Sequence, residues 1–387
     1  MTTIFPIDKL RDITTPFYFY DADLLKQTLE TIRHEASKHS GFTVHYAIKA
    51  NANPKILQII SQAGLGADCV SGGEIRAALN SGFQPHSIVF AGVGKSDWEI
   101  SEAIDSDIYC FNVESVPELD VINSISKSKG KKVNVAFRIN PDVGAHTHSN
   151  ITTGLAENKF GIAMRDMVPI INKCQTMDSV SFIGLHFHIG SQILEMNDFA
   201  ALCSRINELQ NLLEANNIKP TDINVGGGLG VDYDDPDTNP IPDFAQYFDT
   251  YANNLNLRPG QKLHFELGRS VVAQAGSLIT KTLYIKEGQL KRFVIVDAGM
   301  TDLIRPALYQ ASHKIVNISN PDKQSDQTYD VVGPICESSD VFAKQICLAP
   351  TKRGDLIAIR SAGAYGEIMA SGYNCRQLPK GYLSDEI

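Results

Sequence analysis

The chain alternates between two hydrophobic patterns from residue 42 to residue 268. Short runs of β-branched and aromatic residues indicate strands, and longer segments with apolar residues every three or four positions indicate helices. The predicted strands cover residues 42–50, 66–71, 87–92, 108–113, 132–140, 180–190, 222–227 and 262–268. The predicted helices cover residues 54–63, 73–80, 96–104, 115–129, 165–177, 196–216 and 243–257. Eight strands separated by helices favour an α/β fold with a closed (β/α)8 TIM-type barrel over an open doubly wound sheet.

After Gly268 the pattern changes to strands that follow one another without long helices between them. Residues 281–299 indicate two strands joined by a tight turn near Gly288, and strand-like runs recur at residues 328–338 and 355–365. This part of the chain therefore predicts a second, β-rich domain.

Two further segments bear on the domain boundaries. Residues 16–25 contain a strand-like piece before the first helix, which can join the β domain, and residues 317–328 indicate an exposed polar loop. We expect the barrel to cover residues 26–270. The C-terminal β domain is expected to comprise residues 271–387 together with residues 1–25.

The composition is that of an ordinary soluble globular protein. The chain has 387 residues and a mass of 42.4 kDa, with 43% hydrophobic and 20% charged residues. Its formal net charge of −9 disfavours nucleic acid or an anionic membrane as the main partner. The N-terminus lacks the layout of a signal peptide, and no stretch of about 18 apolar residues could span a bilayer.

The seven cysteines are widely scattered, and none lies in a CxxC pair. This spacing argues against a disulfide framework and against a structural zinc site. We therefore expect a reduced, cytoplasmic protein in which most of the thiols are buried.

Residue types that can perform chemistry lie where the predicted barrel strands end. In a (β/α)8 barrel the active site is built at these carboxyl ends, and phosphate sites are made by the loops after strands seven and eight. The candidates are Lys49 after the first strand, His186 and His188 in the sixth, Gly226, Gly227 and Gly228 after the seventh, and Glu266 and Arg269 after the eighth. Each also has a simpler explanation, as a solvated charge, a core histidine or a tight turn.

One interpretation of the histidines is a metal site. His186 and His188 are two residues apart on a strand and project to one face, and His264 and Glu266 have the same spacing. Four such ligands could bind a divalent metal in a barrel hydrolase. This interpretation leaves Lys49 and the glycine run without a role.

A second interpretation, pyridoxal phosphate, uses all the candidates. This cofactor needs a lysine for a Schiff base, a cradle for its phosphate and a partner for its pyridine nitrogen. Lys49 supplies the lysine, Gly226–Gly228 supply exposed backbone N–H groups, and Glu266 supplies a negative partner that keeps the ring nitrogen protonated. The flat imidazole of His188 can stack on the ring.

Ten segments spread over nearly the whole chain match, in order, the motifs of one family. They are residues 46–51 (YAIKAN), 66–75 (GADCVSGGEI), 137–141 (FRINP), 158–162 (NKFGI), 184–192 (GLHFHIGSQ), 224–230 (NVGGGLG), 266–269 (ELGR), 297–309 (DAGMTDLIRPALY), 333–340 (GPICESSD) and 363–376 (GAYGEIMASGYNCR). The chain thereby resembles the pyridoxal-phosphate-dependent decarboxylases of the alanine-racemase-like fold (fold type III), and within them the diaminopimelate decarboxylase family. The resemblance implies an N-terminal barrel, a C-terminal β domain and a homodimer with shared active sites.

The resemblance also implies roles for individual residues. Lys49 looks like the Schiff-base lysine and His188 like the ring-stacking histidine, both of them catalytic. Asp68, Glu74 and Arg138 match positions that support the lysine and the cofactor. The remaining cofactor contacts implied by the family are Ser191, Gly226, Gly227, Gly228, Glu266, Leu267, Gly268, Arg269 and Tyr365.

The family also supplies a proton donor and a substrate set. Cys336 resembles the catalytic proton donor, delivered from the partner subunit, and a thiol near its ordinary pKa carries a proton at neutral pH. The substrate-binding set implied by the family is Arg269, Arg305, Tyr309, Glu337 and Tyr365. Diaminopimelate carries both an ammonium and a carboxylate at its far end. The arginines and Tyr309 could hold the carboxylate and Glu337 the ammonium.

The expected function is decarboxylation of meso-diaminopimelate to L-lysine and CO2 in lysine biosynthesis, with pyridoxal phosphate and without a metal. An ornithine- or lysine-type decarboxylase of the same fold remains the nearest alternative. An alanine racemase would pair the pyridine nitrogen with arginine, whereas this chain offers Glu266. A cofactor-binding protein without catalysis and a metal-dependent barrel hydrolase are the remaining alternatives.

Two departures from the family pattern stand out. Leu267 occupies a position where the family usually has proline, which leaves Glu266 and Arg269 in register. Many relatives also continue into a further strand where this chain ends, shortly after YNCRQLPKGYLSDEI. The second departure concerns the edge of the β domain and not the chemistry.

Overall fold

The structure is a computed structural model that describes residues 5–143, 159–321 and 327–387. It divides into two compact units. The first unit comprises Met1–Thr28, Val231–Pro242 and Arg269–Ile387, and the second comprises Leu29–Gly230 and Asp243–Gly268. The two units are described separately below.

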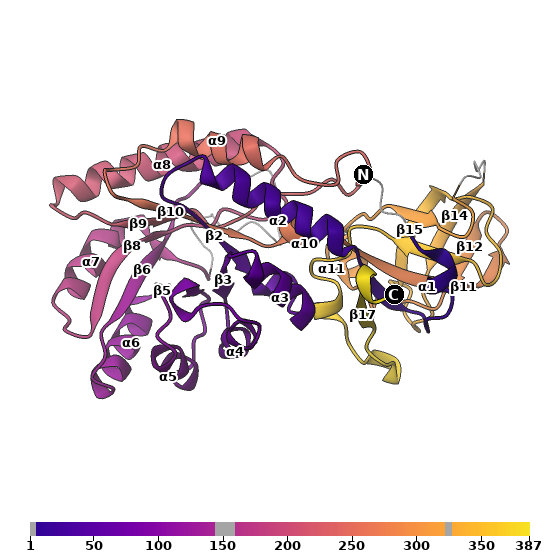
Figure 1. The fold of residues 1–387 in the computed structure, drawn as a ribbon, viewed down its shortest axis with the longest axis horizontal. Helices are drawn as coiled ribbons and strands as arrows, with labels where there is room; N and C mark the ends of the chain where they lie inside the picture. Colours follow the sequence, from indigo (N-terminus) through magenta and orange to yellow (C-terminus); the bar gives the residue numbers. More distant parts are fainter. Residues whose placement is uncertain (1–4, 144–158, 322–326) are drawn as a thin grey trace. The chain divides into compact units, whose positions relative to one another are not determined.

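The second unit is a closed barrel of parallel strands. The sheet runs in the order β5-β4-β3-β2-β10-β9-β8-β6, and pairing between β5 and β6 closes it (Figure 1). A short strand, β7 (Ile162–Ala163), pairs in parallel with the last two residues of β6. The barrel strands are β2 (Phe42–Ala47), β3 (Gly66–Cys69), β4 (Ile88–Phe90), β5 (Cys110–Val113), β6 (Val133–Asn140), β8 (Val180–His186), β9 (Asp222–Asn224) and β10 (Lys262–Leu267). The prediction of an eight-stranded TIM-type barrel is confirmed.

Helices alternate with these strands, as the periodicity predicted. They are α2 (Ala22–Ser37), α3 (Pro54–Gln62), α4 (Gly72–Asn80), α5 (Asp97–Asp105), α6 (Val116–Ser128), α7 (Met167–Gln175), α8 (Met196–Ala215) and α9 (Phe244–Asn254). Polar N-caps begin several of them: Ser71 accepts from the backbone N–H of Glu74, and Ser115 accepts from that of Glu118. The division between the units falls inside α2, at Thr28.

Alternation along β10 separates an aromatic outer layer from a polar barrel interior. The ring of Phe265 packs on α9, with centroids 5.0 Å from Phe248 and 5.2 Å from Tyr251. Successive side chains on a strand point to opposite faces, so His264 and Glu266 project into the barrel. Both are buried there. The barrel interior therefore carries ionisable groups whose interactions are strengthened by the exclusion of water.

The first unit is a curled sheet with short helices. Its strands run in the order β13-β16-β11-β12-β14-β15, and β1 pairs with both β11 and β17. The strands are β1 (Phe17–Tyr20), β11 (Gly276–Glu287), β12 (Arg292–Val296), β13 (Ile315–Asn317), β14 (Thr328–Val332), β15 (Val341–Cys347), β16 (Leu356–Ile359) and β17 (Lys380–Leu383). The helices are α1 (Ile7–Leu10), α10 (Arg269–Val272) and α11 (Arg305–Tyr309). The strand expected in residues 16–25 is β1, and the turn at Gly288 joins β11 to β12.

One segment lies in a different unit from the one expected. Residues 231–242 were placed in the barrel, yet they belong to the first unit. Ion pairs explain the difference: Lys314 Nζ lies 3.0 Å from Asp235 Oδ1, and Arg360 Nη1 lies 2.9 Å from Asp237 Oδ1. Pairing across distant sequence positions is not visible in hydrophobic periodicity.

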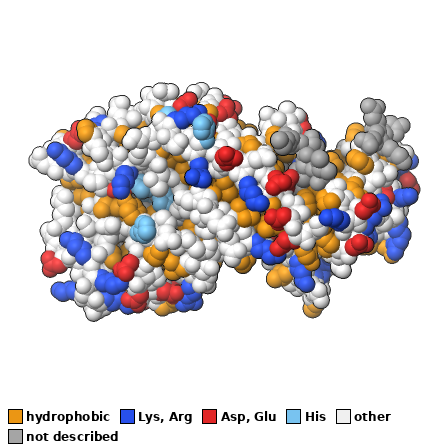
Figure 2. All heavy atoms as spheres, viewed as in Figure 1, with side chains coloured by type: hydrophobic (Ala, Val, Ile, Leu, Met, Phe, Trp, Pro, Cys, Tyr) orange, Lys and Arg blue, Asp and Glu red, His pale blue; other side chains and the backbone are white. Residues whose placement is uncertain are grey.

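The surface agrees with the composition. Figure 2 shows acidic and basic side chains interspersed over the visible face, with no continuous basic patch among the described residues on that face. All seven cysteines are free; Cys336, Cys347 and Cys375 are exposed and the other four are buried. In the described part of the chain, no helix is long and apolar enough to cross a membrane.

Candidate active site

Lys49 lies at the carboxyl end of the barrel strands, called the barrel mouth below. The predicted strand over residues 42–50 is too long, because β2 ends at Ala47 and Lys49 belongs to the following 3₁₀ turn, Ile48–Ala50. Lys49 Nζ lies 3.7 Å from Oδ2 of Asp68 on β3, and 43% of the lysine side chain is exposed. Its amine is therefore anchored beside a carboxylate and open to a reagent that enters the mouth.

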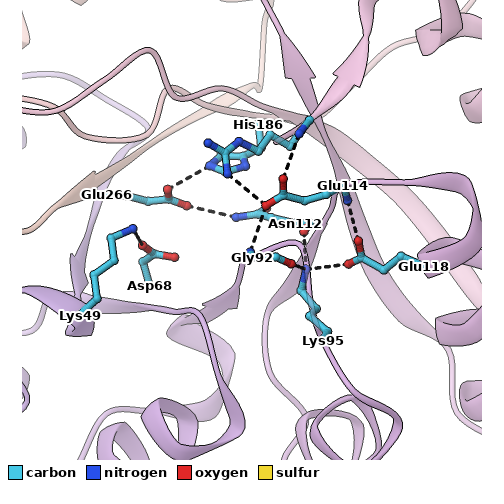
Figure 3. A network of polar contacts seen from close by, with 11 residues as sticks. Lys49, Asp68, Gly92, Lys95, Asn112, Glu114, Glu118, His186 and Glu266 are labelled. Carbon is cyan, nitrogen blue, oxygen red and sulfur yellow. Dashed lines mark hydrogen bonds and ion pairs between the residues drawn. The ribbon is translucent and has the colours of Figure 1, made fainter. Parts of the chain in front are cut away.

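The carboxylate of Glu266 accepts three side-chain hydrogen bonds in the barrel interior. Its Oε1 accepts from Asn112 Nδ2 at 3.1 Å, and its Oε2 accepts from His186 Nε2 at 3.0 Å (Figure 3). Oε1 also accepts from Asn224 Nδ2 at 2.7 Å. Burial raises the pKa of Glu266, but the charge of His186, its hydrogen bond, Lys49 and Asn224 together bring that pKa well below its usual range. Glu266 is therefore ionised.

Asp68 and Glu266 have opposite protonation tendencies. Burial and the nearby charge of Glu266 raise the pKa of Asp68 above its ordinary value, against the opposing effect of Lys49. Two carboxyl groups whose pKa values are separated in this way can perform different tasks in one site. Asp68 is suited to exchange a proton with Lys49, and Glu266 is suited to stay anionic.

His188 lies beyond the strand in which it was predicted. The strand expected over residues 180–190 ends at His186, so that His188 belongs to the loop at the barrel mouth. Burial and the charges of Arg138 and Lys49 lower the pKa of His188 well below its ordinary value, which leaves the ring neutral. A neutral, flat imidazole can stack on an aromatic ring.

The glycine run is required by close packing at the barrel mouth. The strand predicted over residues 222–227 ends at Asn224, and the glycines form the loop that follows. A Cβ atom on Gly227 would lie 2.0 Å from the carbonyl oxygen of Glu266, and one on Gly226 would lie 2.5 Å from that of Phe187. Gly228 has a φ of +109°. These glycines are necessary for the fold. The N–H group of Gly226 donates to Asn224 Oδ1 at 2.9 Å and that of Gly227 donates to His188 Nδ1 at 3.4 Å, so both are engaged within the loops of the barrel mouth.

The other cofactor residues implied by the family also lie near the ends of strands. Ser191 is half-buried in the loop after β8. Leu267, where the family has proline, is fully buried as the last residue of β10 and pairs with Tyr46. Gly268 ends the second unit, and Arg269 begins α10 in the first unit. Asn158 of the NKFGI motif lies outside the described residues.

The four residues proposed as metal ligands do not act as one group. His264 Nε2 contacts Asp222 Oδ1 at 2.8 Å and His264 Nδ1 contacts His45 Nε2 at 3.0 Å, whereas His186 contacts Glu266. Across residues 5–143, 159–321 and 327–387, no cluster of three or more His, Cys, Asp or Glu side chains has the arrangement of a metal site. The histidines are thus divided between two hydrogen-bonded pairs.

Arg138 belongs to a second buried polar group beside Glu266. Its Nη1 lies 3.0 Å from Glu114 Oε1. Lys95, whose side chain is fully buried, donates to Glu118 Oε1 at 2.6 Å and to the carbonyl of Asn112 at 2.8 Å (Figure 3). The backbone of Asn112 is therefore fixed by Lys95 while its side chain binds Glu266. Glu114 also accepts from the backbone N–H groups of Gly92 at 3.1 Å and Gly161 at 3.0 Å, so the group joins the loop after β4 to the end of β5 and to Gly161.

The substrate residues implied by the family lie in the first unit. The Arg269 guanidinium lies 5.0 Å from the ring centroid of Tyr365, and its Nη1 donates to the Tyr233 hydroxyl at 2.8 Å. Arg305 lies 4.8 Å above the Tyr233 ring. Both arginines are buried. Tyr309 contributes to the electrostatic environment of Arg269. These residues form one cluster of aromatic and cationic side chains.

Cys336 and Glu337 lie together in an exposed loop of the first unit. Glu337 Oε1 accepts from the Tyr373 hydroxyl at 2.8 Å, and the backbone N–H of Cys336 donates to Asn374 Oδ1 at 3.3 Å. The Cys336 thiol is free and exposed. The loop is thus tied to the segment around residue 374 rather than to the arginine cluster.

Sequence reasoning missed several residues that shape the site. Asn112 and Asn224 were not singled out, although each is a polar residue near the end of a barrel strand, which is a usable signal. Tyr233 and His313 carry no such signal, because their importance depends on contacts between distant segments. His186 was considered as a metal ligand or as a core histidine, and the structure makes it a buried partner of Glu266.

The residues at the barrel mouth fit a pyridoxal phosphate. Glu266 Oε2 receives a single hydrogen bond from the described residues, which leaves acceptor capacity for a protonated ring nitrogen. Lys49 offers an accessible amine, and His188 offers a neutral ring. The donor set therefore supplies the lysine and the ring-nitrogen partner that this cofactor needs.

The family comparisons agree with this chemistry. The chain matches the model of the pyridoxal-dependent decarboxylase family, pyridoxal binding domain, over residues 24–273. It is 65% identical over 387 residues to a diaminopimelate decarboxylase of Bacteroides thetaiotaomicron, with 100% of both chains covered. It is 43% identical over 362 residues to one of Helicobacter pylori strain J99, covering 94% of this chain and 88% of that one.

Solved structures show the same similarity. The crystal structure of diaminopimelate decarboxylase from Helicobacter pylori complexed with L-lysine matches with a TM-score of 0.92 and 40% identity, covering 98% of this chain and 94% of that chain. A lysine/ornithine decarboxylase from Vibrio vulnificus complexed with putrescine matches with a TM-score of 0.84 but only 20% identity. The second match is evidence for a shared fold alone.

Proposed function

Because the chain belongs to the diaminopimelate decarboxylase family, within the pyridoxal-dependent decarboxylases, we propose that it converts meso-diaminopimelate to L-lysine and CO2. It is a pyridoxal-phosphate-dependent lyase, and because the product of the proposed reaction is L-lysine, the reaction belongs to lysine biosynthesis. The observation that carries the proposal is the buried, ionised carboxylate of Glu266. An alanine racemase would place an arginine there instead.

The second unit supplies the residues for the cofactor. When bound, pyridoxal phosphate accepts the electron pair left by the departing CO2. Lys49 would hold the cofactor through its amine, which lies beside Asp68 and is open at the barrel mouth. The ionised Glu266 would keep the ring nitrogen protonated, and the neutral imidazole of His188 would pack against the ring. Ser191 and the loop of Gly226–Gly228 would hold the phosphate.

The first unit supplies the residues for the substrate. Arg269 and Arg305, with Tyr309 and Tyr365, bind the carboxylate at the far end of diaminopimelate. Glu337 binds the ammonium beside it. A diamine-forming decarboxylase needs an acidic residue for its substrate and gains nothing from two buried arginines, so the arginine cluster supports the diaminopimelate assignment.

We also propose the proton donor and the assembly. Cys336 gives a proton to the carbon that has lost CO2, and its exposed loop makes it available to a second copy of the chain. The active protein is then a cytoplasmic homodimer in which each site takes Lys49 from one subunit and Cys336 from the other. Four buried, free cysteines fit a reducing compartment.

Product identification tests the proposed reaction. The purified protein, loaded with pyridoxal phosphate, is incubated in turn with meso-diaminopimelate, L-ornithine and L-lysine. L-Lysine and CO2 should form from the first substrate with the highest kcat/KM. Formation of putrescine or cadaverine at a comparable kcat/KM would instead identify an ornithine- or lysine-type decarboxylase.

A further inference from the structure

Tyr233 lies between the two arginines of the first unit. Its hydroxyl accepts a hydrogen bond from Arg269 Nη1 at 2.8 Å, and its ring faces the Arg305 guanidinium at 4.8 Å. Burial lowers the pKa of Arg305, Tyr233 raises it, and the charge of Arg269 lowers it again, which shows that the two cations influence each other. Tyr233 thus contacts both guanidinium groups.

The segment around Tyr233 is fixed by its own hydrogen bonds. Asp232 Oδ1 accepts from the backbone N–H groups of Asp234 at 3.0 Å and Asp235 at 2.8 Å, forming a turn with Tyr233 inside it. Lys314 then holds Asp235 at 3.0 Å. The position of the phenol is therefore set by the first unit and not by the arginines alone.

His313 holds Arg305 from the other side. Its Nδ1 donates to the carbonyl oxygen of Arg360 at 2.8 Å, so its Nε2 is left as the acceptor for Arg305 Nη1 at 3.0 Å. Burial and the charge of Arg305 lower the pKa of His313 to about 3, so this tautomer is neutral at working pH. The His313 ring also packs edge-on against Tyr233, with centroids 5.1 Å apart.

These contacts orient Arg305 without neutralising it. In the described part of the chain, no carboxylate forms an ion pair with Arg305; its polar partners are a phenol and a neutral imidazole. An acidic residue at either position would satisfy the guanidinium equally well but would cancel its charge. Neutral acceptors keep the positive charge available for an anion of the ligand.

We propose that Tyr233, supported by His313, is a specificity-determining residue that holds Arg269 and Arg305 as a clamp for the second carboxylate of the substrate. The inference rests on the proposed function, which supplies the substrate with two carboxylates. Tyr233 and His313 act through the arginines and are positioning residues. L-Lysine keeps the clamped carboxylate and cadaverine lacks it, so these two compounds report on the clamp directly.

Competitive inhibition of the holoenzyme by L-lysine and by cadaverine tests the clamp. Tyr233→Phe removes only the hydroxyl, and it should weaken L-lysine inhibition about tenfold or more, because a hydrogen bond to a charged group is lost. Cadaverine inhibition should change by less than about twofold, since no clamped group is present. Tyr284→Phe is the matched control, because Tyr284 is exposed and lies 4.8 Å below Arg353.

A second pair of variants distinguishes loss of the Arg305 orientation from a general loss of structure. His313→Leu removes the acceptor for Arg305 and should weaken L-lysine inhibition, whereas His313→Gln keeps an acceptor oxygen and should restore most of it.

Equal losses for L-lysine and cadaverine in Tyr233→Phe, or no loss for either, would overturn the proposal. A wild-type protein that prefers L-lysine to cadaverine but does not turn over diaminopimelate would retain the clamp and refute the proposed function. A wild-type protein without this preference would refute the clamp.

Discussion

His186 Nε2 donates a hydrogen bond to Glu266 Oε2 at 3.0 Å, while His186 Nδ1 is buried without a partner in the described structure. Asn112 and Asn224 donate hydrogen bonds to the other carboxylate oxygen, Oε1. Glu266 is consequently oriented from three sides and still has one acceptor position on Oε2. This arrangement places a fixed negative charge where a protonated ring nitrogen requires it.

Glu266→Gln should lower kcat by about 100-fold to 1,000-fold, because a neutral amide cannot keep the ring nitrogen protonated as a carboxylate does. Steady-state kinetics at saturating cofactor measure this loss. Glu287→Gln, which changes an exposed carboxylate in β11, is the control. A loss below about tenfold would show that Glu266 has a structural task.

Lys49→Ala should abolish turnover and leave the fold intact, because Lys49 lies in an accessible turn and not in the core. Borohydride reduction followed by peptide mapping should find the cofactor attached to Lys49 in the wild type and to no peptide in the variant. Circular dichroism checks the fold. A cofactor trapped on another lysine of the variant would contradict the assignment.

Gly227→Ala should destabilise the barrel by about 3 kcal/mol or more, because its Cβ would lie 2.0 Å from the backbone oxygen of Glu266. Gly73→Ala is the matched control: it lies in α4, where the nearest atom to a Cβ is Ser71 Oγ at 3.6 Å. Alanine should stabilise that helix slightly. Urea unfolding measures the free energy of unfolding of both variants. Equal values for the two would show that the glycine loop can move to accommodate the added methyl group.

The His45 ring should make stability depend on pH. Burial and the charge of His264 lower the pKa of His45 from 6.5 to about 4. Between these values the unfolded chain binds the proton more readily than the folded chain, so the free energy of unfolding falls as pH drops from 6.5 towards 4. This group should contribute about 3 kcal/mol over the window. Urea unfolding at several pH values should show that the free energy of unfolding depends less steeply on pH in His45→Gln than in the wild type. An unchanged dependence would show that another group causes the effect.

Mixing two inactive variants tests the shared site. Lys49→Ala and Cys336→Ala homodimers should both be nearly inactive. After subunit exchange, random pairing makes half of the dimers mixed, and one of the two sites in each is intact, so activity should recover to roughly a quarter of wild type. Purification through two different tags proves the exchange. Mixed dimers as inactive as their parents would show that Cys336 serves its own subunit or is not the donor.

Local patterns predicted the barrel but not the network inside it. Strands such as Cys110–Val113 were found because short apolar runs recur between helices. Three predicted strands were too long, because the observed strands already end at Ala47, His186 and Asn224. The chain leaves the strand at these points although apolar residues or glycines still follow. A turn at the barrel mouth depends on packing between neighbouring loops, which one segment does not reveal.

Part of the site's chemistry could be predicted from local sequence motifs. Lys49 and Glu266 belong to motifs that cluster at strand ends, so they could be identified without coordinates. Tyr233 could not, since it lies in an acidic loop and becomes important only where Arg269 and Arg305 approach it. The boundary of residues 231–242 was missed for the same physical cause, because its ion pairs join positions far apart in the chain.

The pairing of β1 has a consequence for synthesis on the ribosome. Phe17–Tyr20 pair with residues 276–279 and with residues 380–383, so this apolar strand emerges long before either partner. At about 5 to 20 residues per second, the wait from Tyr20 to Lys380 lasts roughly 20 to 70 s. An unpaired apolar strand is prone to association with other chains during that time. The nascent chain therefore keeps β1 without its native neighbours until β11, and finally β17, has been synthesised.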